Sequence, residues 1–440
     1  MEWLMFLVLI LGTFLLTVFL GLPVAFSFLF TSMVFMFALM GGISGLQQFV
    51  LTLNTSLLNF NLTTIVFYIL MAEFVFQSGM AIKAMDVISR WIGAIPGRLS
   101  IVTMLAGGLF ASLSGSTIAN TAMFGRMMLP EMEKQRYHPS MSAGAIMGSG
   151  ALAMVIPPSG LAIILATLAN ISIGKMLMAS ILPGILLLVL FLGYVVVRSF
   201  LNPRLAPRPA REEGQRDSFA RLITISLRDL FPLLLLIFTV LGLVFLGVAS
   251  PSEAAALGAF IALVLVVAYG QLTLPLLRDV LLQTIRVGVM IFAIMAGSTA
   301  FSQILSYSGA ASGLLQMVSQ SELTAVGLMI GLLLVSLLMG TFMEQAAIMM
   351  ILLPICMPII KEFSIDPFWF AVMFLITLEV GQLSPPVGTS LFTMKGVAPH
   401  MPTKEIYKAA VPFIILNVAA IALIFILPEL ATYLPSEMRR

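Results

Sequence analysis

Apolar stretches, each long enough to cross a bilayer, follow one another along almost the whole chain. A transmembrane helix needs about 20 apolar residues. The sequence offers such stretches at residues 3–20, 22–40, 60–79, 140–170, 177–197, 230–248, 252–269, 287–306, 366–393 and 409–427. A proline pair interrupts 140–170 and 366–393. The pattern predicts an all-α polytopic membrane protein with about ten spans, two of them broken.

Two other apolar segments, 98–135 and 322–360, carry a polar cluster at their centre. If the first of them crossed the membrane once, the basic loops after it would fall on conflicting sides. Short basic loops stay in the cytoplasm. We therefore expect re-entrant hairpins, with 98–135 entering from the cytoplasmic side and 322–360 entering from outside.

The two halves of the chain repeat the same landmarks. The string GSTIAN at 115–120 matches GTFMEQ at 340–345, which lies 225 residues later. The string IPPSG at 156–160 matches SPPVG at 384–388, with the proline pairs 228 residues apart. Five spans per copy is an odd number, so the copies should have opposite orientation, as in many secondary transporters. The domains are then 1–197, a linker at 198–229, a second repeat at 230–430 and a tail at 431–440.

The linker fixes the predicted topology because it is rich in arginine. Its basic residues are Arg198, Arg204, Arg208, Arg211, Arg216, Arg221 and Arg228. With this linker in the cytoplasm, residues 41–58 and both termini lie outside. An amphipathic arm with Lys83 and Arg90, and a segment with Arg278 and Arg286, lie inside. Of the 22 basic residues, only Lys175, Lys361, Arg439 and Arg440 then fall outside.

Composition narrows the class of protein. Hydrophobic residues make up 60% of the chain and charged residues only 9%, whereas a soluble domain carries about 25% charged residues. The single cysteine, Cys356, excludes an intramolecular disulfide framework and a thiolate metal site. With two histidines, His138 and His400, a catalytic metal centre is not expected. No phosphate-binding P-loop is present, so the chain is not expected to use ATP itself. We expect no enzymatic activity and no cofactor.

The hairpin tips and broken spans are the candidate ion sites. A proline pair leaves backbone carbonyls without helical partners, and a dehydrated sodium ion prefers oxygen ligands. We expect one sodium site in each half. The candidate ligands are Ser114, Gly115, Ser116, Asn120 and Ile156 in the first half and Gly340, Thr341, Met343, Ser384 and Val387 in the second.

A substrate carboxylate is expected between the two ion sites. Half-helix N-termini carry partial positive charge and suit anions. The candidate contacts are Thr117, Ser159, Gly160, Gly388, Thr389 and Ser390. Glycine at 160 and 388 would let the backbone approach a ligand closely.

Four ionisable residues fall within the membrane segments, where they are costly and often functional. Glu344, at the second tip, either binds substrate or a cation, or holds the tip by accepting local N–H groups. Arg126 either faces a substrate carboxylate or extends its side chain to the cytoplasmic surface. Glu73 and Glu379 are expected to fix helix packing.

Long strings in the chain are similar to the large (M) subunit of tripartite ATP-independent periplasmic (TRAP) transporters. They are LFASLSGSTIANTAMFG at 109–125, VIPPSGLAIILATLANISIGKML at 155–177 and VGQLSPPVGTSLF at 380–392. The resemblance implies a sodium-coupled elevator carrier for small organic acids in the bacterial inner membrane. It also implies two partners, a small four-helix membrane (Q) subunit and a periplasmic substrate-binding protein. Two positions depart from the family pattern: Glu344 replaces a common aspartate and Ser384 a common threonine.

Three other functions remain open at this point. The first is a stand-alone sodium/dicarboxylate symporter, which would transport without a binding protein. The second is an intramembrane enzyme, which would need a nucleophile and base at membrane depth, where neither histidine is expected. The third is a channel, which the inverted repeat with broken helices disfavours.

Overall fold

The protein is all-helical in this computed structural model, which describes residues 2–208, 218–320 and 324–438. The side chains of Asn61 and of residues 111–114 also lie outside the described part. The first half contains α1 (Glu2–Phe19), α2 (Val24–Leu39), α3 (Ile43–Leu57), α4 (Asn61–Gln77), α5 (Met80–Ile92), α6 (Arg98–Ser114), α7 (Thr117–Lys134), α8 (Pro139–Ala151), the 3-10 helix η1 (Leu152–Met154), α9 (Gly160–Leu168) and α10 (Ile173–Leu201). The second contains α11 (Phe219–Asp229), α12 (Phe231–Phe245), α13 (Pro251–Ala268), α14 (Leu274–Tyr307), α15 (Ala310–Ser319), α16 (Ala325–Gly340), α17 (Gln345–Glu362), α18 (Pro367–Leu383), α19 (Thr389–Val397), α20 (Thr403–Ile426) and α21 (Glu429–Glu437).

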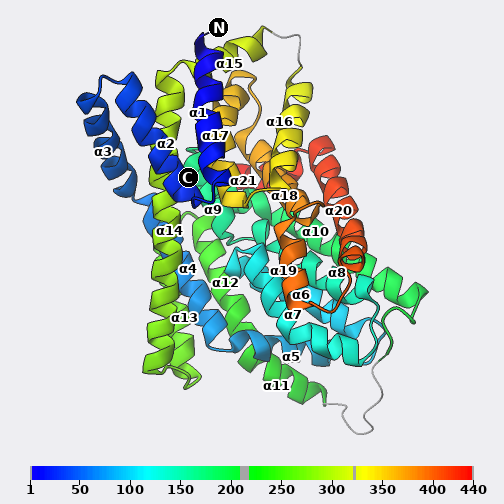
Figure 1. The fold of residues 1–440 in the computed structure, drawn as a ribbon. Coiled ribbons are helices and arrows are strands. Elements are labelled where there is room, and N and C mark those ends of the chain that lie inside the picture. The colour runs from blue at the N-terminus through cyan, green and yellow to red at the C-terminus, as the bar shows by residue number, and fades with distance from the viewer. Residues whose placement is uncertain (1, 209–217, 321–323, 439–440) are drawn as a thin grey trace.

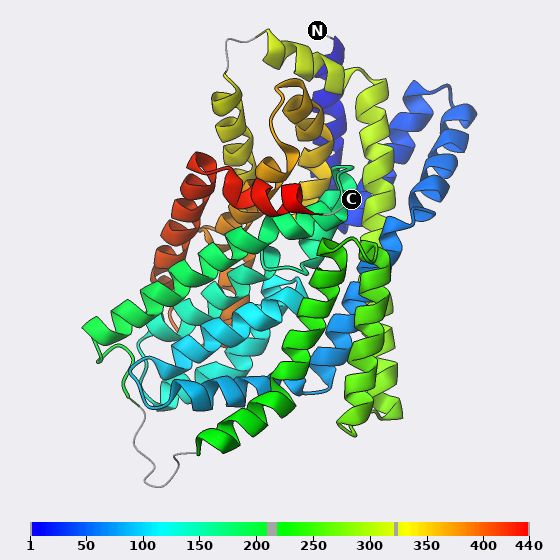
Figure 2. The ribbon, with the colours of Figure 1, turned by 180° about the vertical axis from the view of Figure 1, so that it is seen from behind.

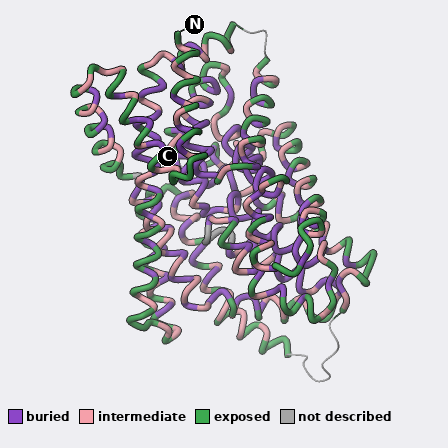
Figure 3. Tube along the Cα trace, viewed as in Figure 1, coloured by how far each residue is buried: buried purple, intermediate pink, exposed green. Residues whose placement is uncertain are grey.

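The helices confirm the expected class of an all-α polytopic membrane protein. Within the described ranges, six helices are long and apolar enough to cross a membrane, or up to eight if each of two bent pairs counts as one span. Helices or broken helix pairs occupy all ten of the predicted span ranges. Large apolar side chains cover the outside, and burial is concentrated in the middle of the molecule (Figure 3). Such an exterior fits lipid as the surrounding solvent.

The two halves interleave rather than form separate lobes. Helix α4 packs along α13, and α2 packs along α14. Glycines allow both approaches, because a Cβ at Gly258 would lie 2.7 Å from Met71 Sδ and one at Gly297 would lie 2.7 Å from Phe28 Cβ. Small residues at such crossings are typical of membrane helix packing. Each half therefore depends on the other for its core.

The halves share an element order but differ at one long helix. In the second half, α14 runs unbroken through the predicted basic segment and the span after it. In the first half, the corresponding chain is a pair, α3 and α4, bent by 50°. Most of the segment 41–58, which is expected outside the membrane, thus forms helix α3, which packs on α2 and α14. Its side of the membrane remains a prediction.

The arms and hairpins of the two halves lie at opposite ends of the molecule. Helix α5 lies at the lower end in Figure 1, and its counterpart α15 lies at the upper end beside the N-terminus. Each arm begins after a glycine in the left-handed region, Gly79 with φ 70° and Gly309 with φ 70°. Only glycine adopts this conformation readily. The shared turn supports the derivation of both halves from one repeat.

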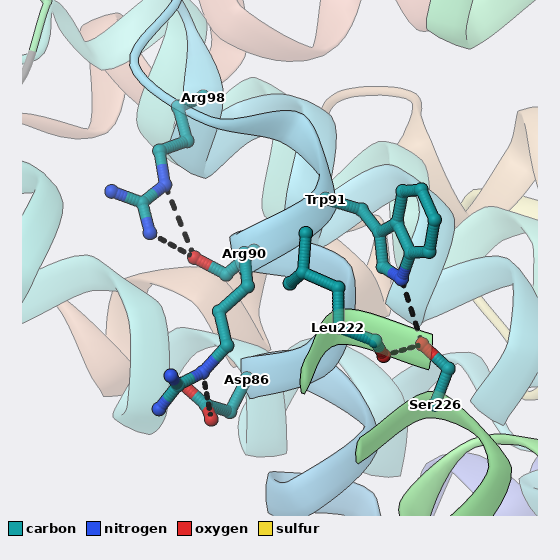
Figure 4. A network of polar contacts seen from close by, with 7 residues as sticks. Asp86, Arg90, Trp91, Arg98, Leu222 and Ser226 are labelled. Atoms are coloured by element: carbon teal, nitrogen blue, oxygen red, sulfur yellow. Dashed lines mark hydrogen bonds and ion pairs between the residues drawn. The ribbon is translucent and has the colours of Figure 1, made fainter. Parts of the chain in front are cut away.

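Both described ends of the linker predicted at 198–229 are partly helical. Helix α10 continues to Leu201, and α11 packs on α5. The Trp91 indole donates to Ser226 Oγ over 2.7 Å (Figure 4). The Phe219 ring meets Trp91 edge-on. In the same view Arg90 pairs with Asp86 at 2.7 Å. Residues 219–229 of the predicted linker thus form an amphipathic helix that packs on the arm α5.

The C-terminal segment is also more ordered than the tail expected at 431–440. Helix α21 buries Ala431 and Pro435 and lies across α10, as Figure 2 shows. Residues 439–440, including the predicted external arginines, lie outside the described part.

Opposite placement of the arms predicts opposite exposure in a membrane. In a Cys356→Ala background, Asp86→Cys on α5 and Gln316→Cys on α15 should react with a membrane-impermeant maleimide from opposite faces. Labelling of both positions from the same face, in intact and in inverted vesicles, would rule out the inverted arrangement.

Candidate functional site

The first hairpin meets the first broken span at its tip. Helix α6 ends at Ser114, α7 starts at Thr117, and Gly115 between them has φ 55°. A Cβ at Gly115 would lie 2.6 Å from the backbone nitrogen of Gly160. The peptide bond Pro157–Pro158 is cis and ends the first part of the broken span. The tip and the break therefore touch through backbone, as their glycines suggest.

The second hairpin meets the second broken span in the same way. The Gly388 N–H donates to the Thr341 carbonyl over 3.1 Å. The peptide Pro385–Pro386 is also cis. In addition, the Gln382 side-chain amide donates to the carbonyls of Gly340 and Met343, at 3.3 and 3.0 Å. Two carbonyls predicted as sodium ligands thus have a protein partner, but each retains a second lone pair.

Four half-helices begin at these tips and breaks, and three of them are capped by polar side chains. Ser116 accepts from the Ala119 N–H at the start of α7, and Ser159 accepts from the Ala162 N–H at the start of α9. Glu344 accepts from the Ala346 N–H of α17 over 3.1 Å. Gly388 occupies the cap position of α19 with φ 26°. Capping explains why serine and a carboxylate occupy these positions.

A buried glutamate joins the two halves at this level. Glu379 on α18 is 0% exposed. Its Oε2 accepts from Thr117 Oγ1 over 2.8 Å and from Gln345 Nε2 over 3.1 Å. Thr117 is the first residue of α7 and Gln345 the first of α17. One carboxyl oxygen therefore brings together the N-terminal ends of both hairpins' second helices.

The fourth helix start, that of α19, lies at the same level. Helix α19 ends opposite the middle of α7, and the turn after α19 reaches the C-terminal end of α7, where His400 Nε2 lies 2.6 Å from Glu133 Oε1. A Cβ at Gly125 would lie 2.8 Å from Val397 Cγ1. Since Gly125 and Val397 each follow their helix start by eight residues, equal rise per residue aligns the first turns of α7 and α19.

Several buried oxygens around these helix starts lack a protein partner. They are Asn120 Oδ1, Thr121 Oγ1, Glu379 Oε1, Thr389 Oγ1 and Ser390 Oγ. Buried polar groups normally find a hydrogen-bond partner. The Asn120 amide nitrogen is already used, since it donates to the carbonyls of Gly107 and Ser149 at 3.4 and 3.2 Å. Its oxygen is left as a ligand atom, which suits the predicted role.

Other predicted site residues have local partners. The Thr341 hydroxyl donates to the Leu338 carbonyl, and the Ser384 hydroxyl donates to the Val380 carbonyl over 2.7 Å. Both oxygens can still accept or ligate. Ile156 packs against Gly184, and Val387 is half-buried beside the break. The side chain of Ser114 lies outside the described part.

The two ionisable candidates differ in position. Glu344 caps α17, which is the geometry of the alternative in which its carboxyl holds the tip. Arg126 is exposed on α7, more than two turns below the helix start. This exposure fits the alternative in which the Arg126 side chain extends to the surface. That Glu344 or Arg126 binds a ligand remains a prediction.

Sequence reasoning missed three members of this cluster. Gln345 and Gln382 follow a tip and precede a break, so their positions beside the repeated motifs were the available signal. Thr121 lies one residue after Asn120 and gave no separate signal. The sequence marks Glu379 as a glutamate within a membrane segment. Its contact with Thr117 spans 262 residues, and no local pattern predicts it.

Comparison with known proteins agrees with this geometry. The family model described as "Tripartite ATP-independent periplasmic transporter, DctM component" matches residues 11–430. The C4-dicarboxylate TRAP transporter large permease protein DctM of Pseudomonas aeruginosa is 29% identical over 381 residues, which cover 86% of this chain and 87% of that protein. The sialic acid TRAP transporter large permease protein SiaM of Vibrio cholerae is 28% identical and covered to 95%, as is this chain.

Two further matches describe the fold and the variety of the family. The YdaH transporter of Alcanivorax borkumensis has a similar fold, with a TM-score of 0.61 at 15% identity over 88% of both chains. The isethionate TRAP transporter permease protein DctMQ of Oleidesulfovibrio alaskensis is 28% identical, and the match covers 86% of this chain but 59% of that longer protein.

The fold and the paired tips and breaks define a polytopic helical membrane protein of the transporter class. The chain belongs to the DctM family and is a TRAP transporter large permease subunit. The resemblance found in its motifs is thereby confirmed. Because its relatives are permease subunits, the expectation that it is not an enzyme is confirmed as well.

Close contact at the first tip makes a testable prediction. Gly115→Ala places a methyl group against Gly160 and forces a left-handed alanine, which alone costs about 1–2 kcal/mol. We expect a lower melting temperature and loss of substrate uptake. Gly331→Ala on α16 is the matched control, because no atom lies within 4 Å of its added Cβ. Equal stability and uptake in both variants would contradict the tip-to-break contact.

Proposed function

We propose that this subunit imports a small organic anion, driven by sodium, after a periplasmic substrate-binding protein delivers it. The observation that carries the proposal is the meeting of four helix starts around Glu379. Helix N-termini present free N–H groups and partial positive charge, which favours an anionic ligand. The same cluster contains buried oxygens without partners, which favours cations. A coupled cation and anion site needs both.

Sodium would bind at the two tip-and-break contacts. Asn120 Oδ1, the Ser116 hydroxyl and the carbonyl at Gly115 are the candidate ligands in the first half. In the second half they are the Thr341 and Ser384 oxygens and the carbonyls at Gly340 and Met343. The substrate carboxylate would lie between these sites, against the first turns of α9 and α19, where Ser159, Thr389 and Ser390 supply hydroxyl groups.

The names of relatives support an organic anion as the substrate class. They specify a C4-dicarboxylate, sialic acid and 2,3-diketo-L-gulonate, all of which carry carboxylates, and isethionate, a sulfonate. A site built from N–H and hydroxyl groups binds any of these headgroups. We place the subunit in the inner membrane with the Arg-rich linker in the cytoplasm, beside a small four-helix Q subunit.

Movement would follow an elevator scheme. The hairpins α6–α7 and α16–α17 and the broken spans α8–α9 and α18–α19 are joined through Glu379 and the tip contacts, so they would move as one body. The interleaved helices α2, α4, α13 and α14 would form the stationary frame. Sodium and substrate binding would neutralise the polar cluster before it crosses the apolar frame.

Reconstituted transport tests the proposal. In liposomes with the Q subunit, uptake of the cognate anion should require both an inward sodium gradient and the binding protein. Uptake without the binding protein would support a stand-alone symporter instead. Uptake that ignores the sodium gradient would contradict the coupling.

Ligand variants test the ion sites. Ser116→Ala and Thr341→Val each remove one oxygen, and one charge-assisted contact contributes about 1.5–3 kcal/mol. The sodium concentration for half-maximal uptake should therefore rise about tenfold or more. Thr341→Ser keeps the oxygen and should retain the normal sodium response. A wild-type sodium response in both ligand variants would refute these assignments.

A further inference from the structure

Glu379 is held on one side only. Its Oε2 accepts two hydrogen bonds, from Thr117 and Gln345, whereas its Oε1 is buried without a partner. Both donors are neutral side chains, and the helix starts that meet here supply only partial positive charge. A buried carboxylate is costly unless it is paired with a positive charge. The geometry therefore favours a positive charge at Oε1 or a proton on the carboxyl group.

No side chain supplies that charge in the described part of the chain. Glu344, which precedes the donor Gln345 in the sequence, is a second carboxyl group and adds negative charge. Lys395 on α19 is bonded elsewhere, since its Nζ donates to the carbonyls of Pro399 and Met401 at 2.8 and 2.7 Å. Arg126 on α7 is exposed.

Two other ionisable groups on the helices packed around α18 are Tyr407 on α20 and Cys356 on α17. Tyr407 donates its hydroxyl proton to the Pro386 carbonyl over 3.0 Å, and Cys356 is buried on α17. Neither carries a positive charge. The remaining groups lie at the start of α18 (Asp366), on α7 (Glu131, Glu133, Lys134), α17 (Lys361, Glu362), α10 (Lys175, Tyr194, Arg198), α20 (Lys404, Glu405, Lys408) and α21 (Glu429, Tyr433, Glu437), and helix α16 has none.

We propose that Oε1 of Glu379 is an additional cation position, which takes up a single positive charge as a proton or a monovalent metal ion. Oε1 is itself a buried oxygen without a protein partner, and an oxygen ligand suits a dehydrated monovalent cation. The position is separate from the two tip-and-break sites. It lies between the two hairpins, because Glu379 accepts from Thr117 at the first tip and from Gln345 at the second. It rests on the proposed sodium-coupled function, because it adds one charge to the coupled set.

Cation-dependent stability of the purified full chain tests this position without substrate or binding protein. The melting temperature is measured against sodium concentration, with choline as the replacement ion, between pH 6 and 9. The variant is Glu379→Gln, and the matched control is Glu73→Gln, a membrane glutamate that also accepts from a glutamine, Gln77, over 2.8 Å. Glu73→Gln should behave as wild type.

The slope of the melting temperature against the logarithm of the sodium concentration reports the number of bound ions. If the occupant is a metal ion, that number should be about one lower in Glu379→Gln. If it is a proton, the sodium dependence should persist, and the pH dependence of the melting temperature in choline should be lost. Unchanged sodium and pH dependences in Glu379→Gln would overturn the proposal.

A second variant keeps the test informative if the first one does not fold. If Glu379→Gln does not fold, Glu379→Asp keeps the charge at a shorter reach. A metal occupant then predicts wild-type steepness at a higher sodium concentration, and a proton occupant predicts a pH dependence that persists with a shifted midpoint. Wild-type values of both midpoints would count against the site.

Failure of the position is distinguishable from failure of the proposed function. Sodium-driven uptake by the wild type would persist in the first case and be absent in the second.

Discussion

The structure depends on placing one carboxyl group in an apolar interior. Glu379 is fully buried, and its hydrogen bonds come from both halves of the chain, from Thr117 on α7 and Gln345 on α17. Breaking either bond would leave a buried polar atom without a partner, which is costly. The carboxyl group therefore fixes the two hairpin tips relative to each other and sets the level at which the polar cluster forms.

The remaining features follow from that constraint and from helix geometry. The tips touch the broken spans through glycine backbone, at Gly115 with Gly160 and at Thr341 with Gly388. Four helices begin where these contacts meet, so their free N–H groups and capping side chains face one small volume. An otherwise apolar protein thereby gains a polar centre. A permease subunit needs such a centre to bind ions and an anion at membrane depth.

Much of this arrangement could be predicted from the sequence because the same motifs occur in both halves of the chain. The paired strings at 115–120 and 340–345, and at 156–160 and 384–388, locate both tips and both breaks. Periodicity could not show that 41–58 forms a helix, because its packing partners α2 and α14 lie outside that segment. The Glu379 contacts were equally hidden, since they join positions 262 and 34 residues apart. Long-range pairing needs the fold itself.

Cross-linking of the two tips in native membranes tests the central claim most directly. In a Cys356→Ala background, Thr117→Cys with Gln345→Cys should be joined by a short bifunctional thiol reagent, because both side chains contact the same carboxyl oxygen. Asp86→Cys with Gln316→Cys, at opposite ends of the molecule, should not be joined. Failure of the first pair to cross-link, with both cysteines shown to be reactive, would contradict the meeting of the two halves at Glu379.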